Sequence, residues 1–246
     1  MAEPFSEQKR HDRAYELIKS RIYAGDYAPG TPLVELQLGE DLHLSRTPIR
    51  NALQKLVYER LAVRDSTGHT FVAKLTAKDI HDITQMRKIL EPTAIRSIES
   101  DPVDPETTNR ILSRLHGILK EQKALALVSP GEPQTESPDR QNALIRYAEL
   151  DHAFHSTTAA LQNNHFLTET ISTVNQTMIR YNILSGTLGQ HTNAALSEHT
   201  LILMYLEKKD YELASIAMRR HVDYVSERIF DESEQAESSS TDTHKK

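Results

Sequence analysis

Four side chains in the carboxy-terminal half are of types that bind metal ions. Asp151 and His155 lie four residues apart in a segment of helical spacing, so their side chains point the same way. His199 and His221 each fall on a helix face that is otherwise apolar and therefore inward. Three imidazoles and a carboxylate suit Zn, Ni, Mn or Fe, and the ligand types alone do not choose among these ions. Because an inward histidine is more often a hydrogen-bonded core residue, the prediction depends on all four together.

A second group of side chains, in the stretch 42–60 (LHLSRTPIRNALQKLVYER), could read DNA. Ser45 and Thr47 can cap a helix, and apolar residues follow them at helical spacing. Arg46 and Arg50 are four residues apart, so both project from the amino end of this helix on one side. Arginine can hold guanine O6 and N7 with two hydrogen bonds, which suits such a helix to a DNA major groove. The alternative is an amphipathic helix with a solvated basic end.

The elements around this stretch predict a winged helix-turn-helix. Residues 11–24 and 34–42 have the spacing of two further helices, which precede the basic one. The segments 61–64 and 70–73 have strand character, and a turn that contains Gly68 joins them into a β-hairpin. In a fold of three helices followed by a hairpin, the third helix is the recognition helix, and here the third helix carries the two arginines.

The rest of the chain predicts an all-helical antiparallel bundle, so the fold class is mainly α. Six helical blocks are expected, at 77–100, 105–128, 141–162, 165–185, 193–208 and 210–231. Residues 129–140 predict a polar, mobile connection, and residues 186–191 predict a loop. The expected domains are a polar tail at 1–10, a winged helix-turn-helix at 11–75, a helical domain at 76–232 and a disordered tail at 233–246.

Composition excludes several classes of function. No apolar run approaches the roughly 20 residues that cross a bilayer, and the amino terminus has no signal-peptide core, so we expect a cytoplasmic protein without membrane contact. The chain has no cysteine, which excludes disulfides and thiolate zinc sites. The net charge of −6 is uneven, since residues 1–74 hold 11 basic and 10 acidic side chains. DNA affinity must therefore come from locally placed arginines and lysines, and from two copies of the domain.

Residues 11–75 carry the motifs of a known family. They contain GDYAPGTPL, then Glu35, then SRTPIRNALQKL, and a wing that ends in TFVA. In these motifs the chain resembles the GntR family of bacterial transcription regulators. The resemblance implies a set of DNA contacts that consists of Ser45, Arg46, Thr47, Arg50, Gly68 and His69. Within this set the two arginines would read guanines and the wing would touch the backbone.

Five positions depart from the family pattern. His43 and Arg60 stand where the family usually has glycine, so both are expected to adopt a left-handed backbone, which these residues tolerate at some cost. Leu36 stands where some members carry a DNA-contacting arginine. The wing has Gly68-His69 in place of the usual Arg-Gly, which changes the groups offered to the minor groove.

The helical part carries a second set of motifs: RKILEP at 87–92, LDHAFH at 150–155, EH at 198–199 and MRRH at 218–221. It resembles the FCD domain, the acid-sensing effector domain of the FadR subfamily of GntR regulators, in its shorter six-helix form. The resemblance implies that Asp151, His155, His199 and His221 hold a divalent metal at the base of a cavity. It also implies that Arg87 lines this cavity and clamps a carboxylate, with Arg180 as a second candidate.

The expected protein is a homodimeric repressor that binds a palindromic operator in double-stranded DNA and responds to a small organic acid. Three alternatives remain open from the sequence. The ion itself could be the signal, the pocket could be vestigial in a constitutive DNA-binding protein, or the four ligands could serve a helical metallohydrolase. The last of these lacks an evident general base beside the ligands.

Overall fold

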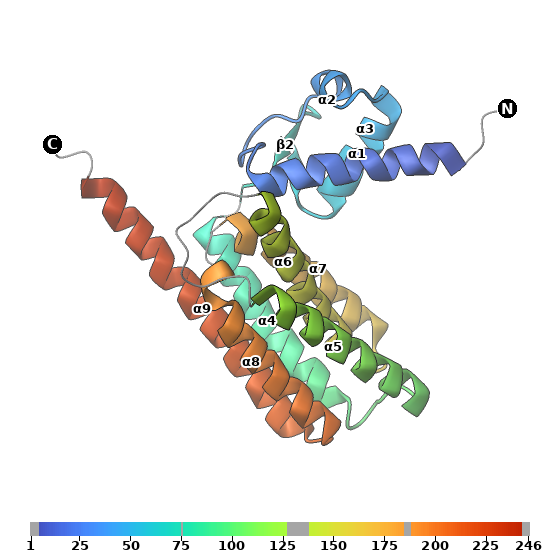
Figure 1. The fold of residues 1–246 in the computed structure, drawn as a ribbon, viewed down its shortest axis with the longest axis vertical. Coiled ribbons are helices and arrows are strands. Elements are labelled where there is room, and N and C mark those ends of the chain that lie inside the picture. Colours follow the sequence, from blue (N-terminus) through green and yellow to red (C-terminus); the bar gives the residue numbers. More distant parts are fainter. Residues whose placement is uncertain (1–4, 75, 127–137, 185–187, 243–246) are drawn as a thin grey trace. The chain divides into compact units, whose positions relative to one another are not determined.

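The chain forms two compact units, Met1–Thr76 and Ala77–Lys246, each of which is described here by itself. The computed structural model describes the backbone of residues 5–74, 76–126, 138–184 and 188–242, and the side chains of 13–74, 76, 78–126, 142–179 and 192–227. Within these residues there are nine helices and one two-stranded sheet (Figure 1). The predicted fold class, mainly α with a small hairpin, is confirmed.

The amino-terminal unit is a winged helix-turn-helix. Its elements are α1 (Phe5–Ala24), α2 (Glu35–Leu42), α3 (Arg46–Tyr58), β1 (Ala62–Arg64) and β2 (Thr70–Val72). The two strands pair antiparallel, with Val63 opposite Phe71. Helix α3 packs on α1 and buries its apolar stripe at Ile49, Ala52, Leu53 and Leu56. This packing leaves the opposite side of α3, with Arg46 and Arg50, exposed to solvent.

The two departures from glycine around α3 adopt the predicted left-handed backbone. His43 ends α2 with φ of 54°, and Arg60 follows α3 with φ of 58°. The turn at His43 is closed by backbone bonds from the N–H of His43 to Glu40 and of Leu44 to Gly39. Both residues therefore occupy a conformation that glycine would adopt without a Cβ penalty.

The carboxy-terminal unit contains the six predicted helices. They are α4 (Ala77–Ser97), α5 (Pro105–Ala126), α6 (Pro138–Ala159), α7 (His165–Leu184), α8 (Leu188–Glu207) and α9 (Tyr211–Asp242). Carboxylate and amide side chains cap three of them: Asp104 accepts from the Thr107 N–H, Asn164 from Leu167 and Asp210 from Leu213. Helix α4 has one internal irregularity, Pro92, which lacks the N–H that would bond to the carbonyl of Lys88.

Several helix ends differ from the sequence-based expectation. Helix α8 begins at Leu188, inside the predicted loop 186–191, since a first helical turn needs no donor partners and tolerates glycine and polar residues. Helix α6 begins at Pro138 because proline suits a first turn, and the rest of the predicted connection lies outside the described residues. Helices α1 and α9 also extend into the predicted tails 1–10 and 233–246, because lengthening a helix costs far less than starting one.

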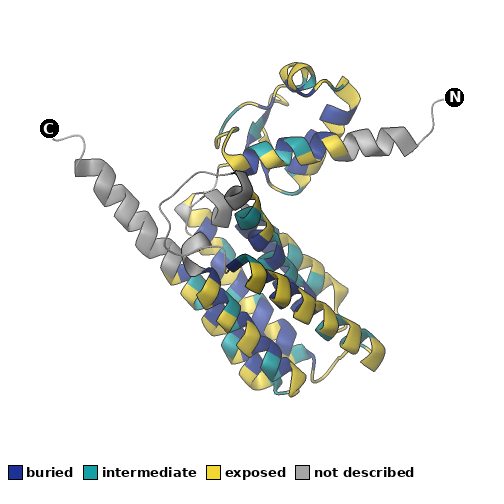
Figure 2. Ribbon diagram, in the orientation of Figure 1, coloured by how far each residue is buried: buried dark blue, intermediate teal, exposed yellow. Residues whose placement is uncertain are grey.

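The helices of the bundle bury one main core and two smaller clusters. Helix α4 packs against α7 and α9, α6 against α5 and α7, and α8 against α5 and α9. Figure 2 shows buried residues on the faces that these helices turn toward one another. The core includes Leu115, Phe154, Ile202, Met218 and Val222. The inward faces of α6, α8 and α9 thus meet inside the bundle, which is where the predicted ligands lie.

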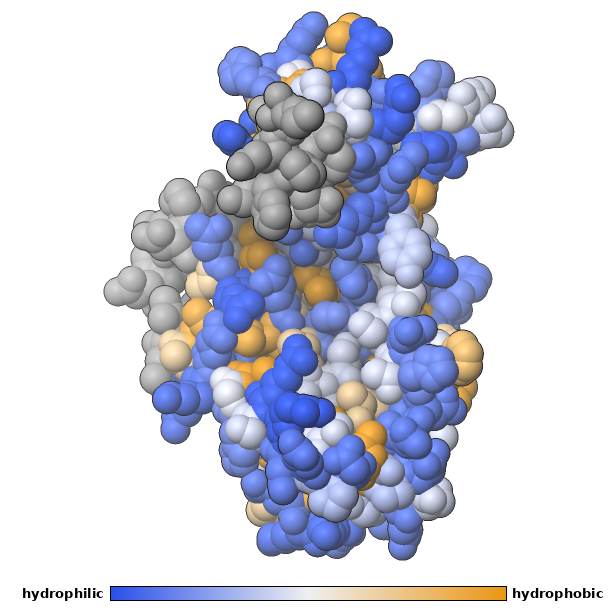
Figure 3. All heavy atoms as spheres, turned by 90° about the vertical axis from the view of Figure 1, so that its right-hand side faces the viewer, coloured by the Kyte–Doolittle hydropathy of each residue, from blue (hydrophilic) through white to orange (hydrophobic). Residues whose placement is uncertain are grey.

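The face of the molecule drawn in Figure 3 is mostly hydrophilic. On the face drawn in Figure 3, apolar residues form separate patches among charged and polar ones. Among the described helices, none combines the length and the apolar character needed to cross a membrane.

Candidate metal centre and nucleic-acid interface

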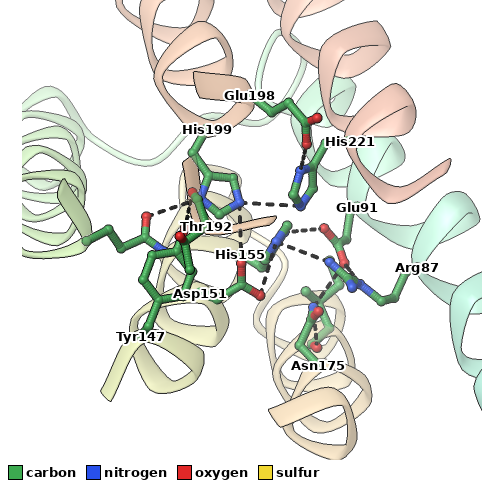
Figure 4. Close-up of polar contacts among 12 residues, drawn as sticks. Arg87, Glu91, Tyr147, Asp151, His155, Asn175, Thr192, Glu198, His199 and His221 are labelled. Atoms are coloured by element: carbon green, nitrogen blue, oxygen red, sulfur yellow. Dashed lines mark hydrogen bonds and ion pairs between the residues drawn. The ribbon is translucent and has the colours of Figure 1, made fainter. Parts of the chain in front are cut away.

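The four predicted metal ligands come together inside the bundle. Asp151 and His155 project from α6, His199 from α8 and His221 from α9, and they point toward one another (Figure 4). One potential ligand atom from each residue lies within 4.8 Å of those of the other three. The three imidazoles are at most 1% exposed. Residues separated by up to 70 positions in the chain therefore form one compact cluster.

The distances between these atoms fit a single ion. His199 Nε2 lies 3.3 Å from His221 Nε2 and 3.6 Å from Asp151 Oδ1. Two nitrogen ligands that are each about 2.1 Å from one ion are about 3.0–3.4 Å apart in octahedral or tetrahedral geometry. Phe154 stacks on the His199 ring at 4.1 Å between centroids and holds its plane. The donor set is thus close enough for shared coordination.

An oxygen acceptor holds the outer nitrogen of each imidazole. His155 Nδ1 donates to Glu91 at 2.6 Å, His199 Nδ1 to Gln122 at 3.2 Å and His221 Nδ1 to Glu198 at 2.7 Å. A carboxylate is only an acceptor, and an amide oxygen likewise accepts, so the proton of each neutral ring lies on Nδ1. Each ring therefore turns the lone pair of Nε2 toward the centre, as in metal sites with outer hydrogen-bond partners.

Burial favours the neutral form of two of the three rings, His199 and His221. Burial lowers the pKa of His199 well below its usual value, and nearby His221, His155 and Arg87 lower it further. Burial also lowers the pKa of His221, although its hydrogen bond to Glu198 opposes the shift. At 3.3 Å the two Nε2 atoms thus face each other as acceptors without a proton between them. A cation between the two nitrogens would accept both lone pairs and remove their mutual repulsion.

Charge around the cluster points to a divalent cation. Three carboxylates, Glu91, Asp151 and Glu198, border the imidazoles, and the guanidinium of Arg87 offsets one of them. Two negative charges remain, which is the charge that a divalent ion balances. The residues present fit the metal that the resemblance implies.

The predicted effector residue Arg87 is the largest of the fully buried side chains, at 2% exposure. Its Nε donates to Glu91 Oε1 at 2.7 Å, and its Nη2 lies 3.1 Å from His155 Nε2. Asn175 on α7 also donates to Glu91, at 3.0 Å. Burial raises the pKa of Glu91, but the guanidinium charge of Arg87 and the hydrogen bonds from Arg87 and His155 outweigh it, so the pKa is lowered overall. Arg180 is on α7, and its side chain lies outside the described residues.

The recognition helix presents its predicted basic end to solvent, with one unpredicted contact. Arg50 Nε and Nη2 donate to the two carboxylate oxygens of Glu35 on α2, at 3.0 and 2.9 Å. These hydrogen bonds lower the pKa of Glu35 and raise that of Arg50. Ser45 occupies the N-cap position of α3, but its side chain makes no capping bond, so that part of the prediction is wrong. Ser45, Arg46 and Thr47 are all exposed.

The wing tip is an ordered turn. Asp65 accepts from the N–H groups of Thr67 and His69, both at 2.9 Å, and from the Thr67 hydroxyl at 2.7 Å. Gly68 has φ of 89°, a backbone that glycine adopts readily. His69 Nδ1 lies 2.7 Å from the Thr67 hydroxyl oxygen, and its side chain is 75% exposed. The predicted wing residues are therefore at the surface, on a hydrogen-bonded turn.

Comparison with known families agrees with this architecture. Residues 82–224 match the FCD domain, and residues 10–72 match the bacterial regulatory proteins of the gntR family. The chain belongs to the GntR family of regulators, with an FCD domain. It binds DNA and regulates transcription, and the family and its relatives are regulators rather than enzymes.

Two curated relatives cover most of the chain. The HTH-type transcriptional regulator YdhC of Bacillus subtilis strain 168 is 26% identical over 215 residues, 87% of this chain and 88% of the relative. The HTH-type transcriptional repressor RspR of Escherichia coli K12 is 23% identical over 223 residues, 90% of each. Among solved structures, a putative GntR regulator from Rhodococcus sp. RHA1 shares the fold with a TM-score of 0.69 and 22% identity, over 91% of this chain and 98% of that one.

The acceptors around the imidazoles were not predicted. Glu91 and Glu198 lie within the motifs that carry the FCD resemblance, and Glu91 follows Arg87 by one helical turn, which could have indicated an ion pair. Gln122 interrupts the otherwise apolar buried face of α5, and a polar residue on such a face signals a buried partner.

Proposed function

We propose that this GntR regulator is a homodimeric repressor whose operator binding is controlled by a small organic acid at a metal-containing site in the helical unit. Membership of the family supports DNA-dependent regulation. The relative RspR is itself named a repressor, which supports the direction of control.

On the DNA side, Arg46 and Arg50 read guanines from the exposed end of α3. Ser45 and Thr47 contact phosphate or base beside them, and Gly68 and His69 touch the backbone from the wing. The support is that all six residues lie at the surface of the amino-terminal unit. Two copies on a palindromic operator double these contacts and place both recognition helices in major grooves.

In the helical unit, Asp151, His155, His199 and His221 hold a divalent cation. One observation carries this proposal: His199 and His221 direct two unprotonated nitrogens at each other across 3.3 Å, with their outer nitrogens held by acceptors. When bound, such an ion would supply Lewis acidity toward a carboxylate oxygen. The ligand set does not distinguish Zn, Ni, Mn and Fe.

The effector is a small carboxylate that Arg87 clamps beside the ion, with Arg180 as a second contact. Guanidinium and carboxylate form charge-assisted hydrogen bonds, and burial of Arg87 strengthens them. Control of DNA binding requires that the acid has different affinities for two arrangements of the protein.

The test compares His199→Ala with His116→Ala. His199 is fully buried in the cluster, whereas His116 on α5 makes an exposed pair with Glu207 at 2.7 Å. We expect the His199 variant to lose bound metal and to melt at a lower temperature, and the His116 variant to match the wild type. Metal is measured by elemental analysis after dialysis. Equal metal per chain in both variants would remove His199 from the ligand set.

Operator binding by the metal-loaded protein then separates the two modes of control. Under the proposal, metal stays bound through dialysis, and fluorescence anisotropy of operator DNA changes only when an organic acid is added. Release that follows the metal concentration alone would instead identify the ion as the signal.

A further inference from the structure

His155 and Arg87 share one hydrogen bond that bears on how the metal site is loaded. The Nδ1 of His155 donates to Glu91 at 2.6 Å, so its Nε2 carries the only lone pair of the ring. Arg87 has donors and no acceptor, and its Nη2 lies 3.1 Å from that Nε2. The lone pair of His155 is therefore the acceptor of an arginine N–H.

The same nitrogen faces the cluster. His155 Nε2 lies 3.9 Å from Asp151 Oδ2, on the side of the ring away from Glu91. One lone pair can accept a hydrogen bond from Arg87 or bind an ion, and it cannot do both. The arrangement in which Arg87 bonds to His155 and the arrangement in which His155 is a ligand exclude each other.

Arg87 has little choice of partner once this bond is broken. Its side chain is 2% exposed, so water does not reach the released N–H as it would at the surface. Its Nε remains bonded to Glu91, which Asn175 also holds in place from α7. A buried donor without an acceptor is costly, and a carboxylate beside the ion would satisfy it.

We propose that Arg87 and a divalent cation compete for His155 Nε2, so that metal loading releases an Arg87 donor and thereby creates the carboxylate site. The inference rests on the proposed metal site and adds an order of events to it. The metal binds first and displaces the hydrogen bond from Arg87 to His155 Nε2. A monocarboxylate then binds to the guanidinium N–H group that Arg87 has released. By reciprocity, the carboxylate raises the affinity for the metal by the same factor as the metal raises the affinity for the carboxylate.

The test uses the full chain with Co²⁺ as the metal and acetate as the carboxylate. Co²⁺ affinity is measured by competition with a chelator, with and without saturating acetate. We expect acetate to raise it about 5- to 150-fold, the usual range of such coupling, and acetate to bind more weakly by the same factor without metal. Wild-type protein that binds no Co²⁺ would overturn the proposed metal site. Co²⁺ binding that acetate leaves unchanged would overturn only this inference.

Arg87→Lys separates competition from charge repulsion. Lysine keeps the positive charge but lacks the planar fork that reaches both Glu91 and His155. We expect the variant to bind Co²⁺ about fivefold or more tightly without acetate, and to lose the acetate effect. Arg96→Lys is the matched control, because Arg96 is on the same helix and forms an exposed pair with Glu212. An Arg87→Lys affinity equal to that of Arg96→Lys and wild type would refute the competition.

A measurement on the wild-type protein makes the test independent of how well Arg87→Lys folds. With ¹⁵N-labelled arginine, the buried Nη–H group of Arg87 should be protected from exchange with water. Addition of Zn²⁺ alone should shift its signal and reduce its protection, and acetate should restore the protection. A signal that Zn²⁺ leaves unchanged would contradict release of the donor.

Discussion

Each unit of the molecule contains an arginine–glutamate pair, and the two pairs differ in burial more than in geometry. Arg50 bonds to Glu35 at 2.9 and 3.0 Å, with side chains that are 59% and 33% exposed. Arg87 bonds to Glu91 at 2.7 Å, with both side chains 2% exposed. In this comparison the same two functional groups therefore meet in water in one pair and in a protein interior in the other.

Burial decides which arginine is free to change its partner. At the surface, water replaces any bond that Arg50 gives up, so it can leave Glu35 for a guanine edge at little cost. In the interior, Arg87 can release an acceptor only in exchange for another one. Under the proposed function, the exposed pair would hold Arg50 ready to contact DNA, and the buried pair would limit when Arg87 can bind a carboxylate.

The largest expected effect comes from breaking the buried pair. Glu91→Ala removes the acceptor of Arg87, His155 and Asn175 at once. We expect the free energy of unfolding of the helical unit to fall by about 3–5 kcal/mol, because a buried guanidinium is left uncompensated. Chemical denaturation followed by circular dichroism measures it. A loss below about 1 kcal/mol would mean that Arg87 finds another buried acceptor.

The exposed arginine should matter for DNA and not for folding. Arg50→Ala should reduce affinity for the operator by about tenfold or more, through loss of a bidentate base contact, and leave the melting temperature unchanged. Anisotropy titrations at fixed salt, with operator and unrelated DNA, measure the change. Full-strength operator binding by the variant would exclude Arg50 as a reading residue.

Smaller effects are expected from the backbone that flanks this arginine. His43 and Arg60 have left-handed φ values of 54° and 58° on either side of α3. His43→Gly and Arg60→Gly should each stabilise the amino-terminal unit by about 0.5–1 kcal/mol, because glycine carries no Cβ penalty there. Thermal unfolding with both single variants tests this. Destabilisation by either glycine would show that the side chain contributes more than its backbone costs.

The smallest effect on stability should come from changing the glutamate of the exposed pair instead of that of the buried pair. Glu35→Gln breaks the ion pair of Arg50, yet the melting temperature should stay within experimental error, since exposed pairs contribute little to stability. Glu91→Gln, which keeps the shape of the side chain, should lower it clearly. Equal shifts in the two glutamine variants would contradict the distinction drawn from burial.

Much of the fold was predictable because local signals agree with the tertiary structure. Periodicity predicted the apolar stripe of α3 and the six helices of the bundle. The left-handed backbone at His43 and Arg60 was predicted because the family usually has glycine at these two positions. Helix ends were less predictable, as at Leu188 and Pro138, because first turns accept residues that also favour loops.

The candidate site was predictable in its centre and not in its surroundings. The ligand types and the family motifs pointed to the four central residues. The pairing of Gln122 with His199, or of Glu35 with Arg50, joins residues on different helices, and only the packing of those helices brings them into contact. Spacing along one helix carries no information about such contacts.

Pro92 gives α4 a mechanical property that the other described helices of the bundle do not share. The missing bond to the Lys88 carbonyl makes the helix easier to bend at this point, directly after Glu91. The part of α4 before Pro92 carries Arg87 and begins at Ala77, the first residue after the amino-terminal unit. The helical segment that holds Arg87 is therefore joined by the chain itself to the DNA-binding unit, and Pro92 separates it from the rest of α4.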